Sequence, residues 1–295
     1  MGGSMFGFEL RKYLQNKMII FIIIGMMLLK ALVSYFSLNI SEPFSEVVYE
    51  RYLVTWDGKL NETKANEIEE ENTRLDYIIS NYPILEEQYH NGEINFKEFY
   101  ECAKEHDKAK TEQDAFIPVY AKFQYYQTTD EHVEFFYDLE ILEFVELFKK
   151  DVILVLLLCV TVSIVTDLDI NRELYSVIKS QPKGRKEFNV TKICGVAFIS
   201  AIMAFLFIGL DVLVYAFRYS FENWDRTIYS IQSLSDFPIN VTLGGYFGII
   251  SVIKVLMIVV TGMLIFFINK LSKKLFLSIF ISVVILVMFS LTGCR

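Results

Sequence analysis

The sequence predicts an all-α polytopic membrane protein with one large helical insert between its first and second spans. Hydrophobic residues make up 53% of the 295 positions, more than is usual for a soluble enzyme. Charge is segregated along the chain. Residues 39–148 hold 26 acidic and 9 basic residues, a net charge of −17, whereas the remainder is net +9. We therefore expect a basic membrane part and an acidic soluble part.

The N-terminal segment, residues 1–17, is expected to form a short amphipathic helix after tag-like residues. The opening MGGS resembles what an expression tag leaves behind. Apolar residues then recur at helical spacing from Phe6 to Leu14, and Glu9, Arg11 and Lys12 lie elsewhere on the helix. The pattern indicates a helix lying on the inner leaflet. The alternative is a cytoplasmic lead-in of no special role.

Five apolar runs approach the roughly 20 residues that a spanning helix needs. The first is 18–38, and the region 151–295 supplies four more at 151–165, 193–217, 247–268 and 275–291. The second run is short and can extend into its flanks. Five spans would put the C-terminus outside, so either one span is miscounted or the chain is truncated before a sixth helix.

Basic residues set the expected orientation. Lys and Arg are frequent before the first span, between the second and third spans, and between the fourth and fifth. Such segments face the cytoplasm. We therefore expect a multi-pass cell-membrane protein with a cytoplasmic N-terminus and with residues 39–150 extracellular. Lys149 and Lys150 count weakly against this orientation.

The insert, residues 39–150, is patterned for helices. Turns are expected at Asp57-Gly58 and Asn91-Gly92, and Asn61 and Asn95 are good N-cap residues. These signals predict helices that begin near residues 62 and 96. Two more are expected, over 114–127 and from about 131 down to the membrane.

The acidic residues of the insert do not form a recognisable metal site. The alternating ligands of a calcium loop are not met, and the three histidines lack metal-ligand spacing. A solvated acidic surface is the simpler interpretation, and such a surface can attract cationic peptides. The sequence predicts no cofactor in this chain, and no basic and aromatic patch indicates nucleic acid.

Residues 167–188 form a charged stretch between the second and third spans. The apolar spacing over 170–180 predicts a short amphipathic helix, with Asp169 near its start and Glu173 on its polar face. Pro182 and Gly184 are expected to stop that helix, and Arg185 follows in a turn before the third span. The alternative is an ordinary basic inner loop.

This order of features resembles the permease subunits of the ABC-2 family of ATP-driven exporters, especially Gram-positive members. The resemblance rests on Asp169, Glu173, Pro182, Arg185 and Lys192 in that order, and on the amphipathic start, the large insert and the cytoplasmic NKLSKK. It implies an ABC-2-type helix bundle in which 167–188 is the helix that couples to the ATPase. It also implies ATP-binding subunits on separate chains, which hold ATP and Mg, and a second permease copy or a homologous permease. The chain has no GxxxxGK followed by Ser or Thr, so it is expected not to be an enzyme itself.

Three charged residues lie inside apolar runs: Lys30, Asp211 and Lys254. Charges in a bilayer are costly and usually face a partner. We expect Asp211 to pair with Lys254 or Lys30. The alternative is that both lysines snorkel separately to the surface.

Two functions remain open. The first is an exporter of peptides, drugs or lipids, for which resistance to antimicrobial peptides is one role. The second is a receptor or sensor whose extracellular domain binds a ligand and signals to an intracellular partner. A membrane-embedded enzyme finds little support, because no HExxH or GxSxG motif occurs.

Overall fold

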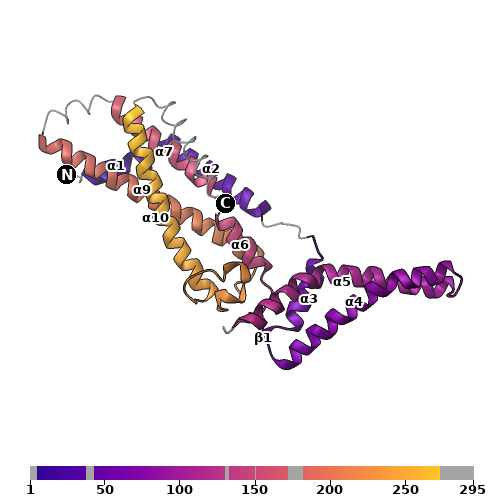
Figure 1. Cartoon of the computed structure of the whole chain (residues 1–295). Coiled ribbons are helices and arrows are strands. Elements are labelled where there is room, and N and C mark those ends of the chain that lie inside the picture. The colour runs from indigo at the N-terminus through magenta and orange to yellow at the C-terminus, as the bar shows by residue number, and fades with distance from the viewer. Residues whose placement is uncertain (1–4, 38–42, 130–132, 150, 172–181, 273–295) are drawn as a thin grey trace. The chain divides into compact units, whose positions relative to one another are not determined.

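The computed structural model describes residues 5–37, 43–129, 133–149, 151–171 and 182–272 (Figure 1). The chain divides into two compact units. The bundle unit comprises Met1–Asn39, Glu143–Ser220 and Phe247–Arg295, and the insert unit comprises Ile40–Leu142 and Phe221–Tyr246. Both are predominantly helical over the described residues, as the sequence predicted.

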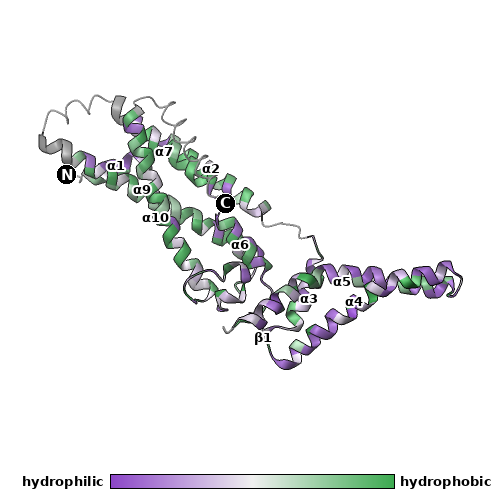
Figure 2. Ribbon diagram, viewed as in Figure 1, coloured by the Kyte–Doolittle hydropathy of each residue, from purple (hydrophilic) through white to green (hydrophobic). Residues whose placement is uncertain are grey.

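The bundle unit is built from apolar helices, which Figure 2 shows mainly in green. Helix α7 is almost continuously buried from Leu154 to Thr166, as expected of a helix that is apolar all round. It packs on α2 and α9, and α2 and α9 pack on each other. The helices are α1 (Met5–Leu14), α2 (Lys17–Ser37), the end of α6 (Leu139–Lys149), α7 (Val152–Asn171), α9 (Pro182–Arg218) and α10 (Leu243–Ser272).

Three described helices are long and apolar enough to cross a membrane: Lys17–Ser37, Phe188–Arg218 and Leu243–Leu271. They coincide with the predicted first, third and fourth spans. The predicted second span corresponds to α7, which is longer than the run 151–165. The predicted fifth span, 275–291, lies outside the described residues.

The stretch 167–188 differs from the prediction at both ends. Residues 167–171 continue α7 rather than begin a separate helix, and Pro182 begins α9 rather than ending a helix. Proline fits the first turn because its missing N–H has no partner there in any helix. Residues 182–188 are therefore helical, not a turn. The remainder of the predicted helix, 172–181, lies outside the described residues.

The insert unit is organised around two long helices, α4 (Glu62–His90) and α5 (Phe96–Thr128), which run side by side in Figure 1. Both predicted helix starts are confirmed. Asn61 Oδ1 accepts from the Lys64 N–H at 2.8 Å, and Asn95 and Glu98 form a reciprocal capping box. The predicted glycine turns are also confirmed, with φ of +90° at Gly58 and +76° at Gly92.

Two boundaries in the insert were predicted wrongly. The segment 114–127 is not a separate helix but the end of α5, which continues through Pro118 because Phe116, Val119 and Phe123 are buried around it. After residue 133 the chain forms a short strand, β2 (Glu134–Phe135), before α6. Strand β2 pairs antiparallel with β1 (Gly58–Lys59), and α3 (Glu46–Thr55) packs against α5.

The second segment of the insert unit is held by buried hydrogen bonds. The Tyr126 hydroxyl donates to the Ser230 carbonyl at 2.6 Å, and Ser230 Oγ accepts from the Glu134 N–H at 3.0 Å. These bonds join the helix and strand of the first segment to the 3-10 turn η1 (Ile228–Ser230), which is followed by a second 3-10 turn, η2 (Gln232–Leu234).

A buried polar triad ties α3 and α5 to the start of α6. The Tyr49 hydroxyl donates to Asp138 Oδ1 at 2.9 Å, and Lys122 Nζ lies 2.8 Å from Asp138 Oδ2. All three residues are at least nine-tenths buried. Burial, reinforced by the charge of Asp138, raises the pKa of Tyr49 far above its ordinary value of 10. The neutral phenol is therefore the form that the folded unit holds.

The raised pKa of Tyr49 predicts alkaline unfolding. Stability should be intact below pH 10 and fall above it by about 1.4 kcal/mol per pH unit for this residue, since only the unfolded chain then releases the phenolic proton. Both tryptophans, Trp56 and Trp224, belong to the insert unit, so tryptophan fluorescence during denaturant unfolding reports on it. Tyr49→Phe should flatten the slope between pH 10 and 12, whereas Tyr77→Phe, at an exposed site, should not. An unchanged slope in Tyr49→Phe would contradict the assignment.

Close packing of α9 on α10 gives a second prediction. A Cβ added at Gly262 would collide with the Ser200 side chain, whereas one added at Gly248, on the same helix, would meet nothing within 4 Å. Gly262→Ile should therefore destabilise the bundle by about 1–3 kcal/mol through overpacking. Thermal unfolding in detergent would measure the difference, with Gly248→Ile as the matched control. Equal midpoints for the two variants would show that α9 and α10 do not pack this closely.

Candidate functional site: a buried ion-pair cluster

Four charged side chains that are far apart in the sequence meet inside the bundle unit. Lys30 comes from α2, Asp211 from α9 and Lys254 from α10, and Asp151 immediately precedes α7. The side chains of Lys30 and Asp211 are 2% and 0% exposed, and those of Asp151 and Lys254 are 11% exposed. The cluster therefore joins four elements at a place that solvent scarcely reaches.

Lys30 stands at the centre of the cluster. Its Nζ lies 3.1 Å from Asp211 Oδ1 and 3.4 Å from Asp151 Oδ1. The other oxygen of Asp151, Oδ2, forms an ion pair with Lys254 Nζ. The charges therefore alternate from Asp211 through Lys30 and Asp151 to Lys254.

Neutral groups make further contacts with Asp211 and Lys254, the two residues at the ends of this chain of charges. Ser34, one helical turn after Lys30, donates its hydroxyl to Asp211 Oδ1 at 3.1 Å. Lys254 Nζ donates to the Phe148 carbonyl at 2.8 Å and lies 3.5 Å from the centroid of the Phe148 ring. A backbone acceptor and a cation–π contact thus supplement the charge of Asp151 around that ammonium.

Charge balance explains why this arrangement is tolerable. Two ammonium groups and two carboxylates sum to zero, so the cluster as a whole has no net charge to desolvate. Burying a single ion costs several kcal/mol, and attraction between close opposite charges offsets that cost where few waters compete. Loss of any one member would leave an uncompensated charge among apolar helices.

The expected pair between Asp211 and Lys30 is confirmed, and the alternative of separate snorkelling is wrong for both lysines. Lys254 pairs with Asp151 instead of Asp211. Asp151 escaped the sequence analysis because it was taken as the first residue of the second span. The sequence did hold one signal for its role: Asp151 follows Lys149 and Lys150, two basic residues on the predicted outer side, where few basic residues are expected.

Three of the other predicted site residues lie where α7 ends and where α9 begins. Asp169 is in the last turn of α7, and Pro182 and Arg185 are in the first turn of α9. Glu173 lies outside the described residues. The ATPase-coupling role of these four residues therefore remains a prediction.

Helix α1 packs against both α7 and α9. The Phe6 ring contacts the Phe198 ring edge-on, with 5.8 Å between the ring centroids. Lys12 Nζ lies 2.6 Å from Glu9 Oε1. Glu9 was expected on the polar side of α1, but it is 4% exposed and faces Gly195, which leaves room for it. The predicted helix therefore exists, with one partly buried ion pair on its packed side.

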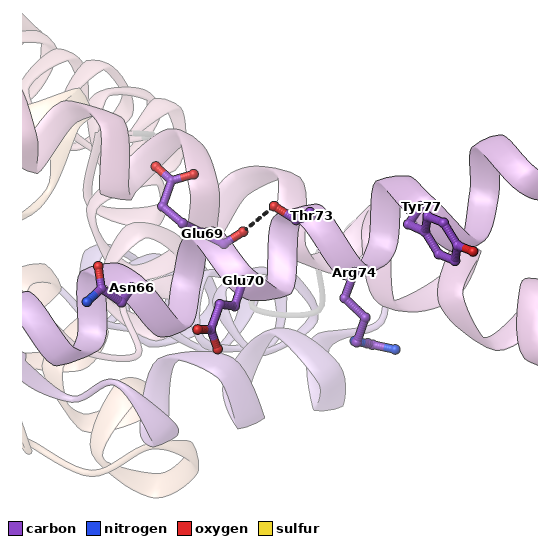
Figure 3. A pocket seen from close by; sticks show the side chains of 6 residues that line it. All are labelled: Asn66, Glu69, Glu70, Thr73, Arg74 and Tyr77. Carbon is purple, nitrogen blue, oxygen red and sulfur yellow. Dashed lines mark hydrogen bonds between the residues drawn. The ribbon is translucent and has the colours of Figure 1, made fainter.

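The acidic surface of the insert unit carries half-exposed ion pairs, such as those of Arg51 and Arg74 with Glu112, rather than an enclosed cluster. A hollow of about 600 Å³ lies along α4. Figure 3 shows the six residues that line it: Asn66, Glu69, Glu70, Thr73, Arg74 and Tyr77. All six come from one helix, and the carboxylates of Glu69 and Glu70 point to different sides of it. Among the described residues, no group of three or more His, Cys, Asp or Glu side chains could hold a metal ion.

Comparisons with known proteins identify no relative: no family model, curated protein or solved structure matches the chain. The arguments for function therefore rest on the residues themselves.

The cluster geometry predicts which charge exchange is tolerated. Asp211→Lys should destabilise the bundle by about 3–5 kcal/mol, because three ammonium groups would then share one carboxylate. Adding Lys30→Asp should recover part of that loss, since the direct pair is restored with reversed sign and Asp151 keeps its pair with Lys254, although the new carboxylate also lies beside Asp151. Adding Lys254→Asp restores the net charge but leaves Lys30 facing the lysine introduced at position 211 and Asp151 facing a carboxylate, and should recover less.

Thermal unfolding in detergent would compare these variants with Lys149→Asp, a charge reversal at an exposed site. Equal recovery with either second substitution would show that only net charge matters. No recovery with Lys30→Asp would contradict the direct Asp211–Lys30 pair.

Proposed function

We propose that this chain is the transmembrane permease subunit of an ATP-driven exporter, with ATP-binding subunits on separate chains. The observation that carries the proposal is the packing of α1 against both α7 and α9, the two helices that residues 172–181 connect. This ten-residue connection is charged, so a cytoplasmic partner that binds it can move α7 relative to α9. The order of features in residues 167–188 resembles the order at the corresponding stretch of ABC-2 permeases.

The ion-pair cluster supports the proposal because it links these helices mechanically. Lys30 Nζ contacts a carboxylate of α9 and the carboxylate that precedes α7. A displacement of α7 relative to α9 would change both contacts at once. Interactions of this kind have a few discrete arrangements rather than a continuum, which suits a transporter that alternates between states.

The proposal includes the partners and location that the sequence predicts. The subunit would lie in the cell membrane of a Gram-positive bacterium with its N-terminus in the cytoplasm and the insert unit outside. It would pair with a second permease, and ATP and Mg would be held by the partner subunits. Peptides, drugs and lipids are the candidate cargo classes.

Co-purification from native membranes tests the proposal. Tagged wild type in mild detergent should bring down an ATP-binding subunit, and the double variant Glu173→Ala, Arg185→Ala should bring down about tenfold less, a loss of about 1.4 kcal/mol in binding. The control is Glu146→Ala, Lys149→Ala, which removes an exposed ion pair of α6. It should behave as wild type.

Recovery of no ATP-binding subunit with wild type would refute the exporter proposal and favour the receptor alternative. Equal recovery with both double variants would preserve the exporter but remove 167–188 as its docking site.

A further inference from the structure

The distal part of the α4–α5 hairpin forms an arm without a buried core. We define the arm as residues 76–108, all of which the structure describes. No residue of the arm is buried, whereas Leu75 and Ala109, which flank it, are each 1% exposed. Figure 1 shows α4 and α5 continuing side by side to the turn at Asn91-Gly92. Two helices packed only on each other cannot enclose their apolar sides.

The arm nevertheless carries many aromatic and aliphatic residues, although Figure 2 shows most of it as hydrophilic with only a few green segments. Some stack between the helices: Tyr82 lies on His106 at 3.9 Å and Tyr89 on Phe99 at 4.4 Å between ring centroids. Others face solvent. Between 54% and 68% of the surface of Tyr77, Ile84, Phe96 and Tyr100 is exposed. Exposed apolar clusters of this kind mark binding surfaces.

A groove runs beside the stacked rings. Its volume is about 300 Å³, and its lining includes Tyr77, Tyr82, Ile84 and Leu85 from α4 and Glu105 from α5. Tyr77, Ile84 and Leu85 follow helical spacing, so one face of α4 supplies most of the apolar lining. A third helix lying along that face would complete a three-helix arrangement.

Charge decides what kind of helix can occupy the groove. The arm contains eight acidic and three basic residues, a net charge of −5. A second arm or an anionic lipid surface would be repelled by this charge, and a cationic partner would be attracted. Glu105 at the groove and the exposed Glu101 one turn before it can pair with Lys or Arg of such a partner.

We propose that the arm binds a cationic amphipathic peptide as a helix, with the apolar side of the peptide in the groove and its basic side chains on the carboxylates of α5. The proposal goes beyond the exporter function and does not depend on it, because it requires neither ATP-binding subunits nor transport.

The test uses the full chain in phosphatidylcholine nanodiscs and a fluorescein-labelled helical peptide of Leu and Lys, about 14 residues long. Two further probes have the same length: a scrambled Leu/Lys peptide without an apolar face, and a Leu/Glu peptide. Fluorescence anisotropy should show saturable binding of the amphipathic Leu/Lys peptide only, above the signal from empty nanodiscs. Binding should weaken as salt rises, because the pairing charges are exposed.

Matched variants locate the site. Tyr77→Ala, Ile84→Ala should weaken binding at least tenfold, and Glu101→Gln, Glu105→Gln should weaken it and reduce its salt dependence. Val54→Ala, Ile117→Ala removes two side chains of similar exposure outside the arm and should leave binding unchanged. Unchanged helicity by circular dichroism would show that each variant is folded.

Three results would overturn the proposal. Equal binding of the Leu/Glu peptide would remove the role of charge, and binding no stronger than to empty nanodiscs would assign the peptide to lipid. If the peptide does not bind but Tyr77→Ala, Ile84→Ala lowers the oligomeric state in ultracentrifugation, the arm is an interface between two copies of the chain.

Discussion

The bundle depends on a single buried ammonium group shared by two carboxylates. Helix α2 contributes few buried side chains, and among them Lys30 is the one that carries charge. Through Lys30 the helix is joined to α9 at Asp211 and to the start of α7 at Asp151. Apolar contacts alone distinguish poorly between helices in lipid, because lipid tails are as apolar as leucine. The ion pairs therefore fix which faces meet and at what depth.

The two units of the chain solve opposite problems. In the bundle unit, the four charges of the cluster are paired with one another, so these polar contacts specify the packing of an otherwise uniform apolar surface. In the insert unit, most charges are exposed, and the buried contacts are aromatic rings around Phe116 and Phe123 together with a few paired charges such as Glu112. The Tyr49–Asp138–Lys122 triad is the insert counterpart of the bundle cluster, with one ammonium group, one carboxylate and a neutral phenol in place of two ammonium groups and two carboxylates.

Local signals in the sequence predicted much of this fold, and distant relations much less. Caps at Asn61 and Asn95 and the apolar length of the spans are properties of a few consecutive residues, so they could be recognised directly. The continuation of α5 through Pro118 depends on packing by residues elsewhere. Asp151 was harder to recognise as a cluster member, because its partners Lys30 and Lys254 come from α2 and α10, which are far from it in the sequence. The pair between Asp211 and Lys30 was predictable since a buried charge requires a partner, but the sequence left two lysines as candidates.

The insert unit is made of two chain segments separated by about 80 residues that include α7 and α9. During synthesis the first segment emerges early, and the Tyr126 hydroxyl can reach the Glu134 carbonyl of the same segment, but its contact with the Ser230 carbonyl can form only after the second segment has been made. The core of the insert unit can therefore be completed only after the chain has been synthesised through α7 and α9 to the second segment. Until then Phe135 and its neighbours lack part of their packing, so the folding of the insert unit depends on a segment that is made late.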